Sequence, residues 1–394
     1  MIRRPPRSTL SPSSAASDVY KRQPFLQQLA GEGGNLWSLV FQLFFIAFII
    51  AYFLYGQRIQ IAIWNRDIER NLRRLKFLRD RARETAIKAV KEIGKPEEDP
   101  VPSIDRFLET FFIQPVDMDP AGIVWKLDRL LDVRDLSMKD AVRRIAPKAS
   151  DTELNNLENL LEAALDLNLI YRIVRHYYLM GKRTNAYIIT AQLHMMLPLI
   201  MDIAYAYDGA VKAFAEGQPI GDGAGPLLAC KLLAGKKVEK IEKDMVFGET
   251  ELEGRHVIVL KAEGPGGNVG KPGEAIEKLI DTYGYRPAII VMVDAAQKFE
   301  GEDTGDVADG VGAAIGGIGT EKYRIEEVAH KHKIPLYAVI IKESLREAIA
   351  PMKKEIYEGV DKAIETVKKI IREKTREGDL VLIAGIGNTI GIAQ

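Results

Sequence analysis

Residues Trp37–Tyr55 read WSLVFQLFFIAFIIAYFLY, and the rest of the chain is organised around this stretch. Its nineteen residues carry no charge. A helix crosses a hydrocarbon core about 30 Å thick with about 20 apolar residues. Trp37 at one end and Tyr52 and Tyr55 at the other suit the membrane interface. We therefore predict a single transmembrane helix over residues 36–56, and the alternative is a buried core helix.

Residues 1–23 (MIRRPPRSTLSPSSAASDVYKRQ) have no apolar periodicity. We interpret them as a non-native, adaptor-derived segment outside the fold, and a basic targeting segment is the alternative. The chain has 55 basic and 55 acidic residues, and this segment holds five of the basic and one of the acidic ones, which leaves 50 against 54. Without an excess of positive charge we expect no nucleic-acid binding. Cys230 is the only cysteine, which excludes an intrachain disulfide and fits a reducing compartment.

Basic residues lie on one side of the apolar stretch. Residues 24–36 contain no Lys or Arg, whereas residues 57–83 contain nine. Positive charge is retained on the cytoplasmic side of membranes. We therefore predict a single-pass protein of the cell membrane, with the N-terminus outside and the large C-terminal part in the cytoplasm.

Residues 57–95 form a basic helical neck in this interpretation. Apolar residues recur in it every seven positions, at Ile61, Ile68, Leu75 and Ala82. A seven-residue repeat is typical of a coiled coil, so the neck helix predicts a homo-oligomer. Contact of the basic side chains with anionic lipid is one alternative. Packing of the helix on its own domain is another.

Residues 101–217 are predicted to be a helical domain, because apolar residues recur there at three- and four-residue spacing. Ser137 with Asp140 and Ser150 with Glu153 have the spacing of capping boxes at helix starts.

The segment Ala186–Ala206 is nearly apolar enough for a second membrane span. It contains Pro198 and Asp202, and a charge inside a bilayer costs a few kcal/mol. We therefore expect a central buried helix.

Residues 218–394 alternate short apolar runs with helical segments. The runs cover residues 244–252, 256–262, 288–295, 336–341 and 380–385, and the helical segments cover residues 273–283, 321–333 and 342–376. This alternation is typical of a mostly parallel sheet with helices on its faces, so we predict a Rossmann-like α/β domain.

Four glycine-rich loops follow predicted strands or helices in this domain. Ligands bind at the carboxyl ends of parallel strands, and glycines allow backbone N–H groups to surround an anion. We therefore predict a shared pocket for a small anionic or nucleotide-like ligand, although each loop could also be a tight turn. The predicted ligand-binding residues are Gly221, Asp222, Gly223, Gly225, Glu263, Gly264, Gly266, Gly267, Gly270, Lys271, Asp294, Gly312, Gly316, Gly317, Gly385, Gly387, Asn388 and Thr389.

Carboxylates accompany these loops. Glu263 and Asp294 end neighbouring predicted strands, and further acidic residues crowd residues 300–309. Carboxylate oxygens hold Mg²⁺, which in turn binds phosphates. Glu263 and Asp294 are therefore predicted metal ligands with Mg²⁺ as the cofactor, and a solvated acidic loop is the alternative.

The loops PIGDGAGPLLA, EGPGGNVGKPG and DGVGAAIGGIG and the terminal GIGNTIGIAQ resemble the archaeal domain-of-unknown-function 1512 family. The resemblance covers nearly all of the chain after Gln23. It implies an archaeal, membrane-associated protein and carries no assigned activity.

The sequence is also similar in one respect to the Toprim catalytic fold of topoisomerases and primases. One predicted strand is followed by Glu263, and the next has Asp294 near its end. In the Toprim fold a glutamate and an Asp-x-Asp pair bind Mg²⁺, and Ala296 stands where this chain would need the second aspartate.

These patterns together predict a membrane protein whose cytoplasmic α/β domain binds an anionic or nucleotide-like ligand in a regulatory role. The alternatives are a Mg²⁺-dependent enzyme acting on phosphate esters and a structural scaffold.

Overall fold

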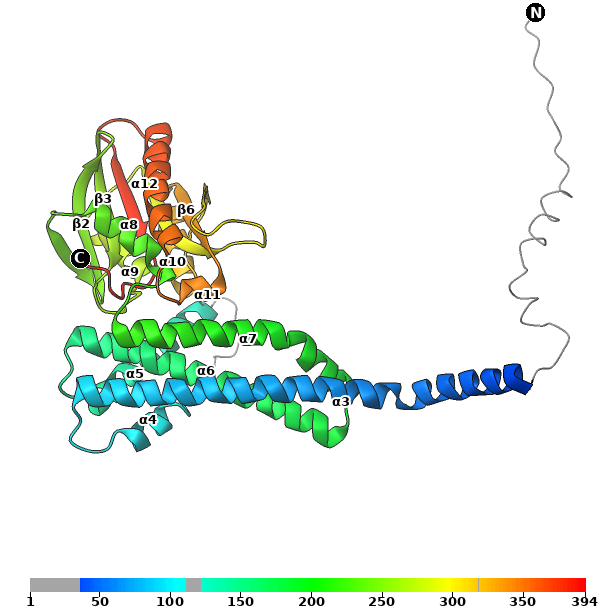
Figure 1. The fold of residues 1–394 in the computed structure, drawn as a ribbon. Helices are drawn as coiled ribbons and strands as arrows, with labels where there is room; N and C mark the ends of the chain where they lie inside the picture. Colours follow the sequence, from blue (N-terminus) through cyan, green and yellow to red (C-terminus); the bar gives the residue numbers. More distant parts are fainter. Residues whose placement is uncertain (1–35, 111–121, 318) are drawn as a thin grey trace, which may run out of the picture. The chain divides into compact units, whose positions relative to one another are not determined.

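The computed structural model describes residues 36–110, 122–317 and 319–394 (Figure 1). The segment interpreted as non-native, residues 1–23, lies outside this part. The chain divides into two compact units, residues 1–63 and residues 64–394. Each is described by itself.

The described residues of the first unit form the beginning of helix α3 (Leu36–Ala89). Its large apolar side chains are exposed, with Trp37 at 82%. The segment Trp37–Tyr52 and the helical segment Tyr55–Gly94 are bent by 51° and together are long and apolar enough for one membrane span. Water-exposed apolar surface on this scale is unusual for a soluble protein.

The second unit begins with helices. After the remainder of α3 come the π-helical turn η1 (Val90–Gly94) and the helices α4 (Val101–Phe107), α5 (Ile123–Ile145), α6 (Asp151–Thr184) and α7 (Tyr187–Glu216). Two residues separate α6 from α7, and the two helices run side by side as an antiparallel hairpin (Figure 1). The helical half of the fold predicted from the sequence is therefore present.

The apolar residues that repeat along the neck pack against other helices of the same chain. Ile68, Leu75 and Ala82 have no exposed surface and share one hydrophobic core with Leu160 and Leu161 of α6. This is the alternative in which the helix packs on its own domain. Homo-oligomerisation through the neck stays a prediction, and these three side chains are not free to support it.

Helix α7 differs from the expectation of a central buried helix. Its second half is buried, as Ala204, Ala210 and Phe214 show, but Ile188 and Met195 in its first half are exposed. Within the described part of the chain, α7 is the one continuous helix long and apolar enough to cross a membrane, and 28% of its most apolar window is buried.

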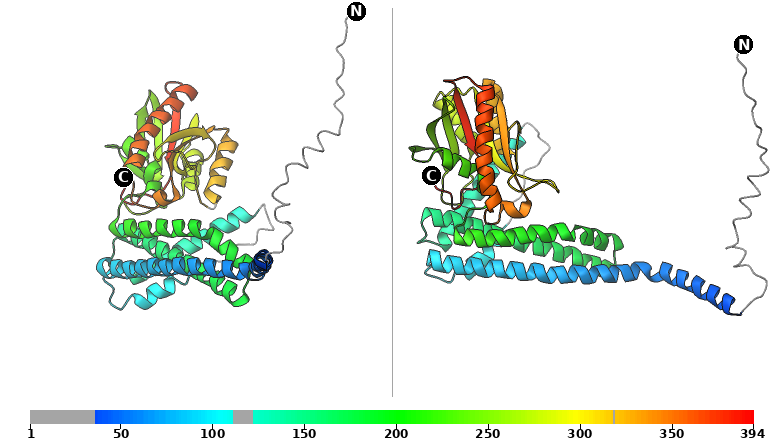
Figure 2. Two further views of the ribbon diagram at one scale, coloured as in Figure 1. Left: turned by 45° about the vertical axis from the view of Figure 1, so that its right-hand side comes forward. Right: turned by 45° about the horizontal axis from the view of Figure 1, so that its top comes forward.

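The C-terminal region holds one seven-stranded mixed sheet (Figure 2). Its order is β1-β2-β3-β7-β4-β6-β5. The strands are β1 (Val238–Glu242), β2 (Met245–Leu252), β3 (Arg255–Ala262), β4 (Ile289–Gln297), β5 (Val307–Val311), β6 (Leu336–Glu343) and β7 (Leu380–Gly385). Strands β3, β7, β4 and β6 are parallel, and β1, β2 and β5 join the two sides in antiparallel pairing.

All five strands predicted from apolar runs are present, and parallel pairing holds for the four central ones. The two edge strands β1 and β5 were not predicted. Their sequences, VEKIE and VADGV, are short and largely polar or exposed, which is typical of sheet edges.

Helices cover both faces of the sheet. Helices α8 (Ala224–Leu232) and α12 (Lys354–Lys374) share a core with alternate residues of the central strands. Helices α9 (Pro272–Glu277) and α10 (Thr320–His332), with the π-helical turn η3 (Lys278–Thr282), share a second core with the other set. The predicted helix 342–376 is interrupted: β6 continues to Glu343, and the short helix α11 (Leu345–Ala348) ends before Pro351.

Strands β4 and β6 are neighbours whose connections lead to opposite faces. The chain after β4 reaches α10 on one face, and the chain after β6 reaches α12 on the other. In α/β sheets, the carboxyl edge at such a point of divergence is the usual place for a ligand.

Candidate functional site

Three acidic side chains lie near the carboxyl ends of β4 and β6, close enough to act electrostatically on one another. Asp294 lies on β4 and is 7% exposed, and Glu343 ends β6 and is 2% exposed. Asp222 lies in the short 3₁₀ turn η2 (Gly221–Gly223), which leads into α8. A Cβ atom on Gly221 would overlap Oε2 of Glu343, so this carboxylate lies directly against η2.

Burial and mutual repulsion disfavour negative charge at this cluster. Burial, and then the nearby Asp222, raise the pKa of Asp294 well above its usual range. Burial, reinforced by Asp222, Glu347 and Asp294, raises the pKa of Glu343 to about 9. Burial also raises the pKa of Asp222. The three groups thus form one electrostatically coupled site.

Hydrogen bonding leaves part of the cluster unsatisfied. Asp294 accepts hydrogen bonds from the N–H groups of Ala295, at 2.8 Å, and Gly316. Asp222 accepts one from the N–H of Asn388 at 2.7 Å. Within the described residues, Oε2 of Glu343 is buried without a hydrogen-bond partner. A buried oxygen left this way costs about 1–3 kcal/mol, so the position calls for a proton or a cation.

The neighbouring Glu347 shows what a satisfied carboxylate looks like here. Burial acts to raise its pKa, but hydrogen bonds from Lys353, Ser344 and Thr304 outweigh burial and lower the pKa to about 2. Lys353 Nζ lies 2.7 Å from Oε1 of Glu347. Glu347 is therefore already neutralised and needs no ligand.

Three of the four predicted glycine loops interlock. An added Cβ atom would overlap neighbouring atoms at Gly221, Gly223, Gly225, Gly264, Gly267, Gly270, Gly385 and Gly387. At Gly225 the neighbours are the carbonyl oxygens of Val293 and Ile386, so α8 can approach the sheet only through a glycine. Thr389 ties two of the loops together, because its Oγ1 lies 2.8 Å from the carbonyl oxygen of Gly266.

The loop after β5 is different. No atom lies within 4 Å of the Cβ positions of Gly312, Gly316 and Gly317. Because the N–H of Gly316 bonds to Asp294, this open loop borders the carboxylate cluster. It is the predicted glycine loop that leaves room for a ligand.

The structure does not bring Glu263 to Asp294. Strand β7 lies between β3 and β4, and the carboxylate of Glu263 pairs with Lys240 at 2.6 Å. Glu263, Gly264 and Gly266 instead line a polar cavity of about 270 Å³ that Lys139 of α5 also lines. The Toprim-like pairing of the two carboxylates is therefore not present in this arrangement.

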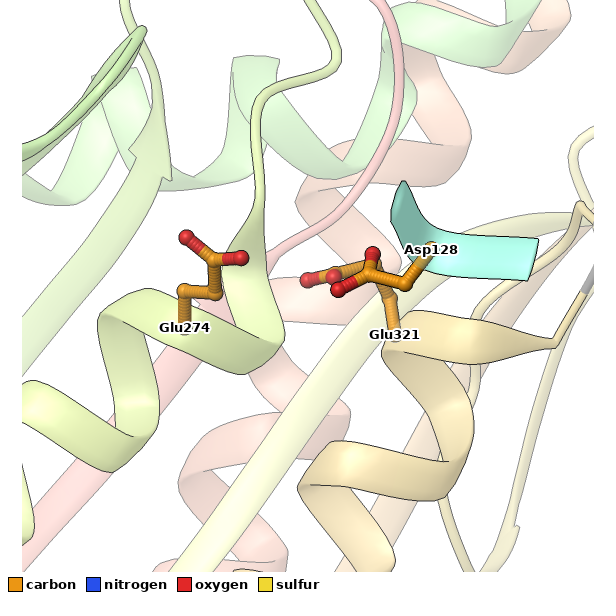
Figure 3. Close-up of side chains that lie close together, drawn as sticks. All are labelled: Asp128, Glu274 and Glu321. Carbon is orange, nitrogen blue, oxygen red and sulfur yellow. The ribbon is translucent and has the colours of Figure 1, made fainter. Parts of the chain in front are cut away.

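Lys271 belongs to a second group of charges. It lies 2.5 Å from Asp132, 3.0 Å from Glu274 and 3.8 Å from Asp128. Figure 3 shows Asp128, Glu274 and Glu321 extending toward one another from α5, α9 and α10. Each offers a carboxylate oxygen, and these three oxygens lie within 4.8 Å of one another.

These oxygens could hold a metal ion. Cations already occupy the surroundings, however, because Arg324 lies 2.8 Å from Asp128 and 3.4 Å from Glu274. We therefore regard this group as an ionic contact between α5 and the α/β region.

The residues predicted from the sequence as ligand-binding include Asp222 and Asp294 of this cluster but not Glu343. The apolar run before it ended at Ile341, and Glu343 was assigned to the next helical segment. A strand extended by two residues would have placed Glu343 at a carboxyl end. Its adjacency to Asp294 still depends on β6 lying beside β4.

Two family descriptions match the chain. "Protein of unknown function (DUF1512) N-terminal domain" matches residues 42–217, and "Domain of unknown function (DUF1512) C-terminal" matches residues 220–393. The junction falls between α7 and η2. No curated protein and no solved structure matches the chain. The two matched regions cover nearly the whole sequence after the first 41 residues, and the chain belongs to the DUF1512 family.

Proposed function

We propose that this chain is a membrane-attached protein whose α/β domain binds a divalent cation, and through it a small phosphorylated ligand, at Asp222, Asp294 and Glu343. The observation that carries the proposal is the buried Glu343 oxygen that has no partner among the described residues, beside two further carboxylates. Carboxylate oxygens in this number are the ligands that Mg²⁺ prefers.

A cation explains how an acidic site can serve an anionic ligand. Three carboxylates would repel a phosphate directly, whereas a bound Mg²⁺ neutralises them and offers its remaining positions to phosphate oxygens. The open loop of Gly312, Gly316 and Gly317 supplies room beside Asp294. The interlocked glycine loops do not offer such room, so we place the anionic ligand at the carboxylates.

The membrane part of the proposal rests on the first unit. Exposed apolar side chains from Trp37 to Tyr52 support a single anchor, and the nine basic residues of segment 57–83 support a cytoplasmic location for the C-terminal part of the chain. The Rossmann-like character proposed for the domain rests on the four parallel strands and the helices on both faces.

Thermal unfolding of the full chain in detergent, with and without Mg²⁺, tests the cation site. Binding at a hundred times the dissociation constant stabilises the folded state by about 2.7 kcal/mol. Glu343→Gln should abolish this gain and should stabilise the protein in the absence of Mg²⁺, because the folded state no longer has to bury an acid whose pKa is raised to about 9 and which must take up a proton on folding. Glu373→Gln, on an exposed position of α12, is the matched control and should respond like the unaltered chain.

Equal stabilisation of Glu343→Gln and the unaltered chain by Mg²⁺ would refute the site. Absence of any Mg²⁺ effect, with Glu343→Gln still stabilising, would show that the cluster is held neutral by protons. Adding inorganic phosphate or a nucleotide in the presence of Mg²⁺ tests the ligand. Release of phosphate from a phosphate ester in the same mixture would favour the enzyme over the regulatory binding protein.

A further inference from the structure

The free end of the α6–α7 hairpin has an unusual charge distribution. From Leu167 to Met201, a segment we call the hairpin tip, the sequence contains no Asp or Glu and four Lys or Arg residues. Arg172 pairs with Glu109. In the described part of the chain, Arg175, Lys182 and Arg183 have no ion pair. The hairpin tip therefore presents unneutralised positive charge.

Part of this charge surrounds a hollow on α6. Arg172, Arg175, His176 and Arg183 line a cavity of about 300 Å³ together with Leu179 and Met180. The volume and the lining suit a phosphate-bearing group with an apolar neighbour. Guanidinium groups bind phosphate oxygens through paired N–H donors.

Apolar side chains accompany the cations. Ile188, Met195 and Leu199 are 67%, 77% and 53% exposed. Their spacing of seven and four residues places them on one stripe of α7. Ile173 and Tyr177 of α6 are also exposed. The cations lie on α6 and the stripe lies on α7, its partner in the hairpin. A helical surface that combines cations with exposed apolar side chains is typical of a membrane-surface contact.

The packing of the second half of α7 argues against a membrane span. Ala204 and Ala210 in its second half lie in the helical core, and Tyr205 faces the guanidinium of Arg346 at 5.5 Å. Only the exposed first half is available to lipid. This geometry favours lying on a surface over spanning it.

The chain also keeps the hairpin tip within reach of the anchor. Trp64 packs against Tyr187 and His194 of α7, with ring centroids 5.1 Å and 5.7 Å apart. Trp64 comes nine positions after Tyr55, and a segment of that length spans at most about 30 Å. The hairpin tip can therefore contact the bilayer that holds the anchor.

We propose that the hairpin tip binds the surface of an anionic bilayer. Arg175, Lys182 and Arg183 contact lipid phosphates, and the stripe of Ile188, Met195 and Leu199 enters the interface. This surface adds to the membrane attachment proposed above, and it does not involve the carboxylate cluster.

The test uses the full chain with Cys230→Ser, so that Ile188→Cys supplies the only thiol for a fluorophore. The protein is reconstituted into phosphatidylcholine vesicles with or without phosphatidylserine, and the lipids carry a quencher on the acyl chain. Phe299→Cys, a site 79% exposed in the α/β region, carries the control label. We expect quenching at residue 188 that depends on phosphatidylserine and no quenching at residue 299.

Charge variants sharpen the test. Replacing Arg175, Lys182 and Arg183 with Gln should weaken docking about fivefold per charge. Replacing Lys362, Lys369 and Lys374 of α12 changes the net charge equally and should have no effect. Equal quenching in both variants, or in vesicles without phosphatidylserine, would overturn the proposal. The proposal would also be overturned if the label at residue 188 became less accessible to the lipid quencher as more protein was added per vesicle. That result would mean that a second copy of the chain, and not the bilayer, covers the hairpin tip.

Resistance to alkaline carbonate extraction reports the anchor separately. Protein that stays in the membrane with residue 188 unquenched refutes the hairpin contact alone. Protein that is extracted refutes the anchor.

Discussion

At the scale of single residues, the same fold imposes opposite protonation on neighbouring acids. Glu343 and Glu347 are four residues apart, yet the pKa of one rises to about 9 and that of the other falls to about 2. Both lose hydration on folding. Glu347 regains hydrogen bonds and a cation, whereas the charges that act on Glu343 are those of Asp222, Glu347 and Asp294. The number of hydrogen-bond donors around a buried carboxylate, and not the extent of its burial, decides whether it has a structural role or is available to a ligand.

Glu158 of α6 gives a prediction of pH dependence. Burial raises its pKa from 4.5 to about 7; Lys139 opposes this shift, and Glu162 and Asp135 reinforce it. The folded state therefore holds a proton that the unfolded state has released, so stability falls as pH rises from about 4.5 through 7. Glu158→Gln should be more stable than the unaltered chain by on the order of 2 kcal/mol at pH 8 and equal to it at pH 4.

Thermal unfolding at the two pH values measures this difference. Glu84→Gln, an exposed position of α3, is the matched control for the same change of side chain. An equal gain for Glu158→Gln at both pH values would contradict a titrating Glu158.

At the scale of elements, a helix cap was predicted correctly from the sequence where both partners of its hydrogen bonds lie a few residues apart. The capping box predicted at Ser150 and Glu153 is confirmed: Ser150 N–H donates to Oε2 of Glu153 at 2.8 Å, and α6 begins at Asp151. The one predicted at Ser137 and Asp140 is wrong, because both residues lie inside α5. Apolar residues on both sides of Ser137 continue the helix, so packing overrides the local alternative.

Ser150→Ala should therefore destabilise the protein by about 1 kcal/mol, the usual loss for a helix cap. The midpoint of thermal unfolding should fall by about 1–2 °C. Thr184→Ala, at the other end of α6, is the control, because the Thr184 hydroxyl bonds only within the helix, to the carbonyl of Met180. Equal losses at the two ends would mean that the cap makes no special contribution.

At the scale of the whole molecule, charged contacts join the helical region to the α/β region. Arg324 of α10 pairs with Asp128 of α5 at 2.8 Å, and Lys139 of α5 pairs with Asp244 at 2.9 Å. Asp128 and Arg324 are largely buried, so removal of one partner leaves the other uncompensated.

Arg324→Met should destabilise the protein by about 3 kcal/mol, because it removes the guanidinium that pairs with the largely buried Asp128 and leaves only Lys271, at 3.8 Å, beside it. Arg324→Met combined with Asp128→Asn should recover part of this loss, and the double-mutant cycle gives the coupling. Lys322→Met, close by on α10 and exposed, should change stability by less than about 0.5 kcal/mol. Additive effects of Arg324→Met and Asp128→Asn would show that the contact is not coupled.

The local patterns of the sequence were sufficient for the five apolar strands, the helical first half, the cap at Ser150 and the family. Each depends on residues close in sequence, whose spacing sets periodicity and capping. Strand order was not accessible in this way. Tertiary structure put β7 between β3 and β4, which separated Glu263 from Asp294, and put β6 beside β4, which brought Glu343 in. It also buried Ile68 and Leu75 in the chain's own core and placed atoms of other segments against most of the glycines in the predicted ligand loops. These outcomes depend on contacts between segments far apart in the sequence, and apolar periodicity carries no information about which segment becomes the partner.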